Sequence, residues 1–353
     1  MQTAAIHMAP QSHRPSGRGA RSTGRPVSLS ADPLRFASAY HAPVMAAAVV
    51  DGLVTDRAGI YIDGTLGGGG HSDALLNALT PTGCVIGIDK DAEALAASEE
   101  RLSYAVEAGR FRTIHGNFAD MEDLLADADV EAVHGVLLDL GISSHQIDEA
   151  ARGFAFSADG PLDMRMDAST GETAAELIDR LDVQAITDLL RAYGDEPRAW
   201  PIANAIVEHG AFATTGELAE VVRSAVPAKE EVKTLARVFQ AFRIAVNDEM
   251  SALERTLEAA LNVLRPGGHL AVISYHSLED RRAKHYLRFG NLEGEAKKDF
   301  YGNLLTPWNL LTRKPIVATP EEIQANPRAR SARLRISEKK PDPQTSHPRQ
   351  RES

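Results

Sequence analysis

This sequence has little cysteine and lacks long apolar runs, and both features exclude classes of protein. Cys84 is the only cysteine among 353 residues, which excludes a disulfide framework and a thiolate metal cluster. It lies in an apolar run, where we expect a small buried core residue. No stretch approaches the roughly 20 apolar residues of a membrane span, and the N-terminus lacks the apolar centre of a signal peptide. We therefore expect a cytoplasmic protein.

Charge is distributed unevenly along the chain. The net charge of −11 divides into +4 for residues 1–35, −20 for the middle and +5 for residues 323–353. An acidic body is repelled by bare phosphate, so we expect any RNA contact to be confined to local basic strips. In the alternative interpretation, the two basic ends are solubilising tails.

Apolar, β-rich runs alternate with helical patterns, which is typical of a parallel sheet covered by helices, the α/β class. The expected strands are Ile60–Asp63, Val85–Asp89, Arg112–His115, Val136–Asp139 and Leu270–Ser274. Three of the five end in Asp, so we expect carboxylates at the carboxyl edge of the sheet, where open sheets bind their ligands.

The interval between the fourth and fifth strands is far longer than the dozen or so residues of a crossover helix. Capping boxes at Thr173–Glu176 and Thr214–Glu217 predict helices there. We expect an inserted helical subdomain, and then one long helix from Leu235 to Leu264 that Pro266-Gly267-Gly268 ends. The predicted boundaries are 38–146 and 236–338 for the main domain, 147–235 for the insertion, and 1–37 and 339–353 for disordered extensions.

A glycine-rich turn joins the first strand to a helix. The turn from Asp63 to His71 contains five glycines, which permit positive φ and let a ligand touch the backbone. Dinucleotides and S-adenosylmethionine both use such turns. The glycines do not fit G-x-G-x-x-G, and Gly-Lys-Ser/Thr does not follow, so the dinucleotide and P-loop interpretations are disfavoured.

Later strand ends carry further candidates for the same site. Asp89 is placed to accept hydrogen bonds from ribose hydroxyls; alternatively it caps the helix that begins near Asp91. Phe118 is expected against an adenine ring or in the core. Asp139 leads into a polar loop, residues 141–146, at the same edge of the sheet.

Several long motifs of this chain resemble the bacterial 16S ribosomal RNA (cytosine-N4)-methyltransferase family, RsmH/MraW. The most unusual are DGPLDMRMD at residues 159–167 and ISYHSLEDR at residues 273–281. The others are His41–Val44, Asp63–Ser72, Asp139–Asp148, Arg152–Phe154, Phe239–Asn247 and Asn326–Ser331.

The resemblance implies a class I S-adenosylmethionine-dependent methyltransferase, with a Rossmann-like sheet interrupted by a helical substrate-recognition subdomain. The implied activity is methylation of the N4 amino group of a cytidine in the decoding region of 16S ribosomal RNA. The implied cofactor contacts are Gly69, Gly70, His71, Asp89, Phe118, Asp139 and Gln146. His145 stands where the family usually has proline, and Trp200-Pro201 interrupts a stretch that is usually basic.

Methyl transfer to an amine needs positioning and a proton acceptor, and it needs no metal or covalent nucleophile. The catalytic candidates, taken from three loops predicted to meet at the carboxyl edge, are Asp139, Ser143, Asp163, Asp167, Ser274 and His276. Alternatively, Asp163 and Asp167 pair with Arg165 or cap a helix, and His276 is structural. The target cytidine is expected to be splayed out of its stack.

Two basic strips, residues 281–284 and 328–335, are candidates for RNA contact. The alternation at residues 332–336 predicts a strand, which leaves solvated edge charges as the alternative. An acidic body with few basic strips favours the 30S subunit or a late assembly particle as substrate over naked RNA. A homodimer is compatible with the sequence.

Three other functions remain as alternatives on the sequence alone. A nicotinamide oxidoreductase would share the glycine-rich turn and the Asp at the end of a strand. Methylation of a DNA or protein amino group differs only in the target, although residues 139–142 do not form the Pro-Pro-aromatic loop of many DNA amino-methyltransferases. A non-enzymatic assembly factor would have lost the transfer.

Overall fold

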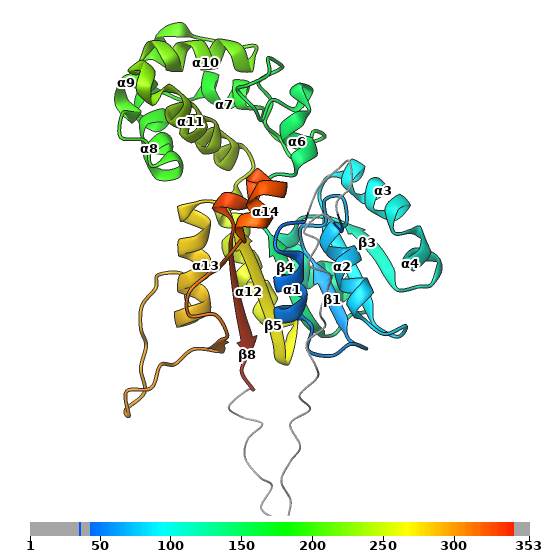
Figure 1. The fold of residues 1–353 in the computed structure, drawn as a ribbon. Helices are drawn as coiled ribbons and strands as arrows, with labels where there is room; N and C mark the ends of the chain where they lie inside the picture. The colour runs from blue at the N-terminus through cyan, green and yellow to red at the C-terminus, as the bar shows by residue number, and fades with distance from the viewer. Residues whose placement is uncertain (1–34, 37–42, 342–353) are drawn as a thin grey trace, which may run out of the picture.

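The structure is a computed structural model that describes residues 35–36 and 43–341. The predicted disordered extensions fall almost entirely outside these residues. The described part contains one mixed sheet, helices on both of its faces and a group of helices at one end (Figure 1). Within these ranges no helix is both long enough and apolar enough to cross a bilayer.

The sheet has the strand order β3-β2-β1-β4-β5-β8-β6, with β7 paired to β8. Strands β1 to β5 are parallel, and β8 is antiparallel to β5. All five predicted strands are confirmed. The strands are β1 (Ile60–Asp63), β2 (Cys84–Asp89), β3 (Phe111–His115), β4 (Val133–Asp139), β5 (Leu264–Ser274), β6 (Trp308–Leu310), β7 (Ile316–Val317) and β8 (Arg333–Lys339).

Alternation along each strand divides the core into two layers. On β4, Leu137 joins a cluster under α1 (Ala46–Leu53) and α2 (Gly70–Ala78), whereas Leu138 joins a cluster under α5 and α12. The bounds of those two helices are α5 (Met121–Asp127) and α12 (Glu249–Val263), and the sheet is also flanked by α3 (Ala92–Arg101), α4 (Ser103–Glu107) and α13 (Ser277–Phe289). The short helix α14 (Pro320–Ala325) lies at the end of the sheet nearest the helical group (Figure 1). Cys84 is half-buried at the start of β2, so the expectation of a buried core residue is wrong.

The chain between β4 and α12 forms a helical body with its own apolar cluster. Its helices are α6 (Ser144–Asp148), α7 (Ala174–Arg180), α8 (Val183–Gly194), α9 (Ala199–His209), α10 (Thr215–Ser224) and α11 (Glu231–Val246). Both predicted capping boxes are present, at the starts of α7 and α10. Figure 1 shows α7 to α11 grouped beyond one end of the sheet.

The predicted single helix from Leu235 to Leu264 is wrong. Two helices, α11 and α12, replace it, because Asp248 takes a left-handed conformation at φ 47°. The side chain of Asn247 stabilises the break by accepting a hydrogen bond from Met166 N and donating one to Met164 O. The predicted subdomain boundary at residue 235 lies within α11, whose buried side chains join the helical cluster as far as Phe242.

Candidate active site

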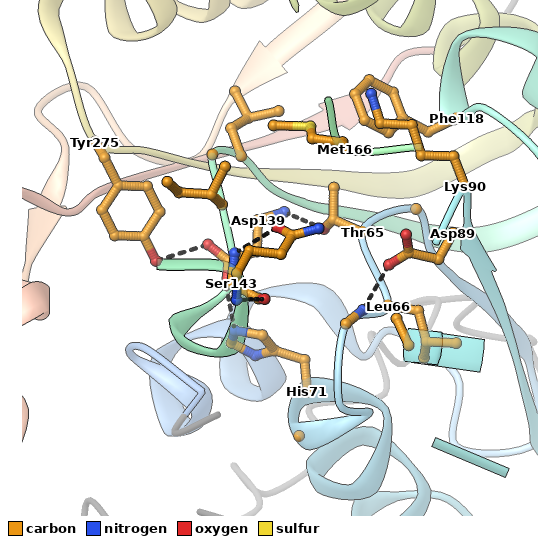
Figure 2. Close-up of a pocket in the computed structure, with 18 residues that line it drawn as sticks. Thr65, Leu66, His71, Asp89, Lys90, Phe118, Asp139, Ser143, Met166 and Tyr275 are labelled. Atoms are coloured by element: carbon orange, nitrogen blue, oxygen red, sulfur yellow. Dashed lines mark hydrogen bonds and ion pairs between the residues drawn. The ribbon is translucent and has the colours of Figure 1, made fainter. Parts of the chain in front are cut away.

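A cavity of about 90 Å³ opens at the carboxyl ends of β1, β2 and β4 (Figure 2). The glycine turn, the loop after β4, the end of β5 and the loop before α7 all contribute to it. Its lining residues are Gly64, Thr65, Leu66, Gly67, Gly70, His71, Asp89, Lys90, Ala94, Phe118, Asp139, Leu140, Gly141, Ile142, Ser143, Gln146, Met166 and Tyr275.

The glycine turn is shaped by residues with positive φ. Gly67 has φ 49° and Gly69 has φ 72°, conformations that a side chain disfavours. No atom lies within 4 Å of where a Cβ on Gly67 would stand, so this part of the turn faces open space. The buried carboxylate of Asp63 lies beneath the turn and accepts a 2.8 Å hydrogen bond from Ser72 Oγ.

Asp89 joins the second strand to the glycine turn. Its Oδ2 accepts a 2.8 Å hydrogen bond from Gly67 N, and its Oδ1 accepts one of 3.0 Å from Asp91 N. The residue that caps α3 is Asp91, whose carboxylate accepts from Glu93 N, so the helix-cap alternative for Asp89 is wrong. Burial raises the pKa of Asp89, against the lowering effect of its two backbone donors.

The carboxylate of Asp139 is held from both sides. Tyr275 donates a 2.8 Å hydrogen bond from its hydroxyl to Oδ1, and Nε2 of His71 lies 3.3 Å from Oδ2. Burial lowers the pKa of His71, but the carboxylates of Asp139 and Asp63 outweigh burial and raise it above the ordinary value. Burial and the Asp139 charge raise the pKa of Tyr275, so its hydroxyl stays protonated and donates.

The loop after β4 is closed by side chains that reach back to α3. Gln146 accepts a hydrogen bond from Ser143 N and donates one of 3.1 Å to Asp91 Oδ2. Arg152 Nη1 lies 3.2 Å from the same Asp91 oxygen. The loop is therefore tied to the cap of α3, and it closes one wall of the cavity.

Six of the seven residues expected to contact the cofactor line this cavity; they are Gly70, His71, Asp89, Phe118, Asp139 and Gln146. Gly69 does not line it, and is the residue before α2, where a Cβ would meet Ser98 at 3.1 Å. Among the catalytic candidates, Asp139 and Ser143 line the cavity.

The four remaining catalytic candidates lie outside the cavity lining, and their catalytic roles stay predictions. Asp163 binds Arg165 through two hydrogen bonds of 2.8 Å. Asp167 accepts hydrogen bonds from Ser169 N and Oγ. Ser274 is buried and donates to Arg333 O at 3.4 Å, whereas His276 lies 3.0 Å from Glu279 Oε1 at the start of α13. The Asp163–Arg165 pair agrees with the structural alternative for Asp163, whereas Asp167 neither binds Arg165 nor caps a helix in the described part of the chain.

Sequence reasoning missed several lining residues, notably Thr65, Lys90, Met166 and Tyr275. Met166 lies inside the DGPLDMRMD motif and Tyr275 inside the ISYHSLEDR motif, each next to a catalytic candidate. Ser274 Oγ donates a hydrogen bond to Arg333 O on β8. The hydroxyl of the next residue, Tyr275, points to Asp139 (Figure 2). Thr65 Oγ1 accepts a 2.7 Å hydrogen bond from Asp139 N.

The strip at residues 328–335 does not present a row of free cations. Arg328 pairs with Asp148, while Arg333 and Arg335 both pair with Asp280. Its predicted strand is confirmed as part of β8, but β5 pairs with one side of β8 and β6 and β7 pair with the other, so the edge-strand alternative is wrong. In the other strip, Arg282 pairs with Glu254.

The cavity fits a cationic cofactor better than a diphosphate. A diphosphate in this cavity would lie among the lining carboxylates of Asp89 and Asp139, and the like charges would repel one another. Asp89 and Asp139 instead provide hydrogen-bond acceptors for hydroxyl and ammonium groups. Leu66, Phe118 and Met166 supply apolar walls. These features suit the ribose, the amino acid end and the adenine ring of S-adenosylmethionine.

Comparisons with known proteins agree with this assignment. The model of the MraW methylase family matches residues 38–340. A protein from Chlorobium chlorochromatii, named ribosomal RNA small subunit methyltransferase H, is 48% identical over 322 residues, covering 85% of this chain and 96% of that protein. A protein of the same name from Phocaeicola vulgatus is 43% identical over 304 residues, covering 85% and 98%.

Among solved structures, an rRNA methylase from Streptococcus thermophilus covers 83% of this chain and 92% of its own, at 13% identity and a TM-score of 0.36. The assignment depends on the sequence matches, which span nearly all of the described residues. The chain belongs to the MraW methylase family and is an S-adenosylmethionine-dependent methyltransferase.

Proposed function

We propose that this enzyme methylates the N4 amino group of a cytidine in 16S ribosomal RNA. Its curated relatives at 43% and 48% identity carry the name ribosomal RNA small subunit methyltransferase. The observation that carries the proposal is the doubly held carboxylate of Asp139, which lies at the end of β4 and borders the cofactor cavity. An oriented carboxylate there can align an amino group for attack and accept its proton.

The cytosine amino group is a poor nucleophile because its lone pair is delocalised into the ring. When bound, S-adenosylmethionine supplies a methyl group whose bond to the sulfonium sulfur breaks, leaving the electron pair on sulfur, as the N4 lone pair forms the new C–N bond. Asp139 aligns one N4–H bond beforehand and accepts the proton released. Tyr275 and His71 hold the carboxylate in that orientation.

The apolar part of the cavity lining provides a binding surface for the splayed base. Met166 comes from the loop before α7, and Leu140 and Ile142 come from the segment after β4, so a base in this region would leave water on entry. The exclusion of water strengthens the interaction between the carboxylate and the amino group. Ser143, the other catalytic candidate in the lining, is proposed to orient the base with its hydroxyl.

We infer that the substrate is the RNA within a 30S subunit or late assembly particle. The middle of the chain carries a net charge of −20, and several arginines of the two basic strips are neutralised by carboxylates. An acidic protein with few free cations binds naked RNA weakly, whereas a folded particle can add protein contacts. Comparable methylation of protein-free 16S RNA and of 30S particles would contradict this inference.

The test uses purified enzyme, 30S particles and methyl-labelled cofactor. Wild type is expected to label the 16S RNA, and digestion to nucleosides is expected to place the label in N4-methylcytidine. Asp139→Asn is expected to lose transfer, because the amide cannot accept the proton. Asp127→Ala, on the exposed end of α5, is the control. A label at another atom, or undiminished transfer by Asp139→Asn, would overturn the proposal.

A further inference from the structure

A second cavity, of about 390 Å³, lies on the far side of β5 from the cofactor cavity. It is enclosed by α13, β8 and the segment between β6 and β7, and it shares no lining residue with the first cavity. Its polar lining consists of Lys284, Arg288, Thr312, Arg313, Arg335 and Ser337. The lining includes four cationic side chains and no carboxylate.

Three of these cations are free to bind a ligand. Lys284, Arg288 and Arg313 form no ion pair within the described part of the chain. The guanidinium of Arg288 lies 5.1 Å from the centre of the Phe289 ring, a contact that leaves its N–H groups available. Such a concentration of unpaired positive charge stands out in a body whose net charge is −20.

The floor of the cavity is formed by β8. Alternation along this strand places Arg335 and Ser337 on one face, toward α13. Arg335 is 8% exposed, and Asp280 fixes its guanidinium through bonds of 2.8 and 3.1 Å. Asp280 also binds Arg333, so two cations share one carboxylate and this group keeps positive charge in excess.

Ser337 provides an independent indication of a ligand. Its side chain is fully buried, and its Oγ has no hydrogen-bond partner among the described residues. A buried hydroxyl without a partner is unfavourable, so such groups mark places where a bound molecule completes the hydrogen bonding. A hydroxyl donor beside several guanidinium and ammonium groups matches the oxygens of a phosphate.

We propose that this cavity binds a phosphate group of the RNA backbone, on a nucleotide outside the reaction centre. This inference rests on the proposed function, because it takes the bound phosphate to belong to the RNA substrate. Ser337 lies opposite Leu270, four residues before the carboxyl end of β5, or roughly 13 Å along the strand. A phosphate held there would fix the course of the RNA strand relative to the methylated base.

The experiment compares two double variants of the full chain with equal changes in charge. Arg288→Ala with Arg313→Ala removes two cavity cations. Lys297→Ala with Lys314→Ala removes two exposed cations that lie outside the cavity lining. The first variant is expected to raise KM for 30S particles about tenfold, and to make the slope of log affinity against log salt concentration shallower by about one unit. Its kcat and its affinity for S-adenosylmethionine are expected to stay unchanged.

Titration with inorganic phosphate, monitored by ³¹P NMR, measures phosphate binding to the cavity in the absence of RNA. Wild type is expected to bind phosphate, Ser337→Ala several-fold more weakly, and the Arg288/Arg313 variant hardly at all. Equal effects of the two double variants on KM would show a general field effect and overturn the proposal. Phosphate binding by wild type, combined with an unchanged KM for 30S particles in the Arg288/Arg313 variant, would assign the cavity to a free phosphorylated molecule. That result would overturn the RNA as the source of the phosphate.

The outcomes also separate this inference from the proposed function. If wild type fails to methylate 30S particles but binds phosphate in the cavity, the proposed function fails and the phosphate site stands without an RNA source. If wild type methylates 30S particles normally and the Arg288/Arg313 variant matches it in KM and salt dependence, the proposed function stands and this inference fails.

Discussion

The hydroxyl of Tyr275 donates a 2.8 Å hydrogen bond to Oδ1 of Asp139, joining the end of β5 to the end of β4. These residues are 136 positions apart in the chain, with the entire helical body between them. The bond orients the carboxylate that we propose as the proton acceptor. Removing this hydrogen bond therefore tests the orientation of the carboxylate while the carboxylate itself stays in place.

Tyr275→Phe is expected to lower kcat about tenfold or more, because a hydrogen bond to a charged group is typically worth about 1.5–3 kcal/mol. The KM for S-adenosylmethionine is expected to change little. Steady-state methylation of 30S particles measures both. Tyr286→Phe, a buried tyrosine on α13 away from the cofactor cavity, is the matched control. A kcat equal to that of wild type would show that the Tyr275 hydroxyl does not position Asp139 for transfer.

Asp89→Ala is expected to weaken S-adenosylmethionine binding by about ten- to a hundredfold, or about 1.4–2.7 kcal/mol. The carboxylate accepts a hydrogen bond from Gly67 N and is the proposed acceptor for the ribose hydroxyls. Calorimetric titration with the cofactor gives the change. Asp127→Ala should match wild type in the same titration. Unaltered binding by Asp89→Ala would remove Asp89 from the cofactor site.

The stability of the enzyme should depend on pH through His71. The pKa of this buried histidine is raised by Asp139 and Asp63 despite burial. A raised folded-state pKa stabilises the fold below the ordinary value of about 6.5, and this contribution is lost as pH rises through the folded-state pKa. The free energy of unfolding of wild type minus that of His71→Asn should therefore fall as pH rises from about 6 to 8. A difference that stays constant between about pH 6 and 8 would contradict the assignment.

Asn247→Ala is expected to destabilise the enzyme by about 2 kcal/mol, since each of its hydrogen bonds contributes about 0.5–1.5 kcal/mol. Asn247 binds Met164 O, Met166 N and Arg243 O. Because Met166 lines the cofactor cavity, the KM for S-adenosylmethionine should also rise. Urea denaturation and steady-state kinetics measure the two effects.

Asn262→Ala is the control for Asn247→Ala: it removes one exposed hydrogen bond, to Glu122, and should lower the free energy of unfolding by less than about 1 kcal/mol. Equal losses in the two variants would show that Asn247 has no special role in holding the 163–167 loop.

The strands and the position of the cavity at their carboxyl ends followed from local patterns. Apolar runs ending in Asp mark β1, β2 and β4, because a buried parallel strand is apolar along its length and meets ligand only where it ends. The glycine turn was recognisable for the same kind of reason, since glycine tolerates positive φ. The break between α11 and α12 could not be recognised from the sequence, because the periodicity of apolar residues continues through it. Contacts with a distant loop stabilise the break.

The sequence by itself determined the α/β class, the five parallel strands, the family and six of the residues that line the cavity, because each depends on adjacent residues or on motifs read in order. Only the tertiary structure decided that Tyr275 and His71 hold Asp139, that Asp163 and Asp167 bind within their own loop, and that Asp280 neutralises Arg333 and Arg335. The partner of a charged side chain is set by which strands and helices lie beside it, and folding brings those together from distant parts of the chain.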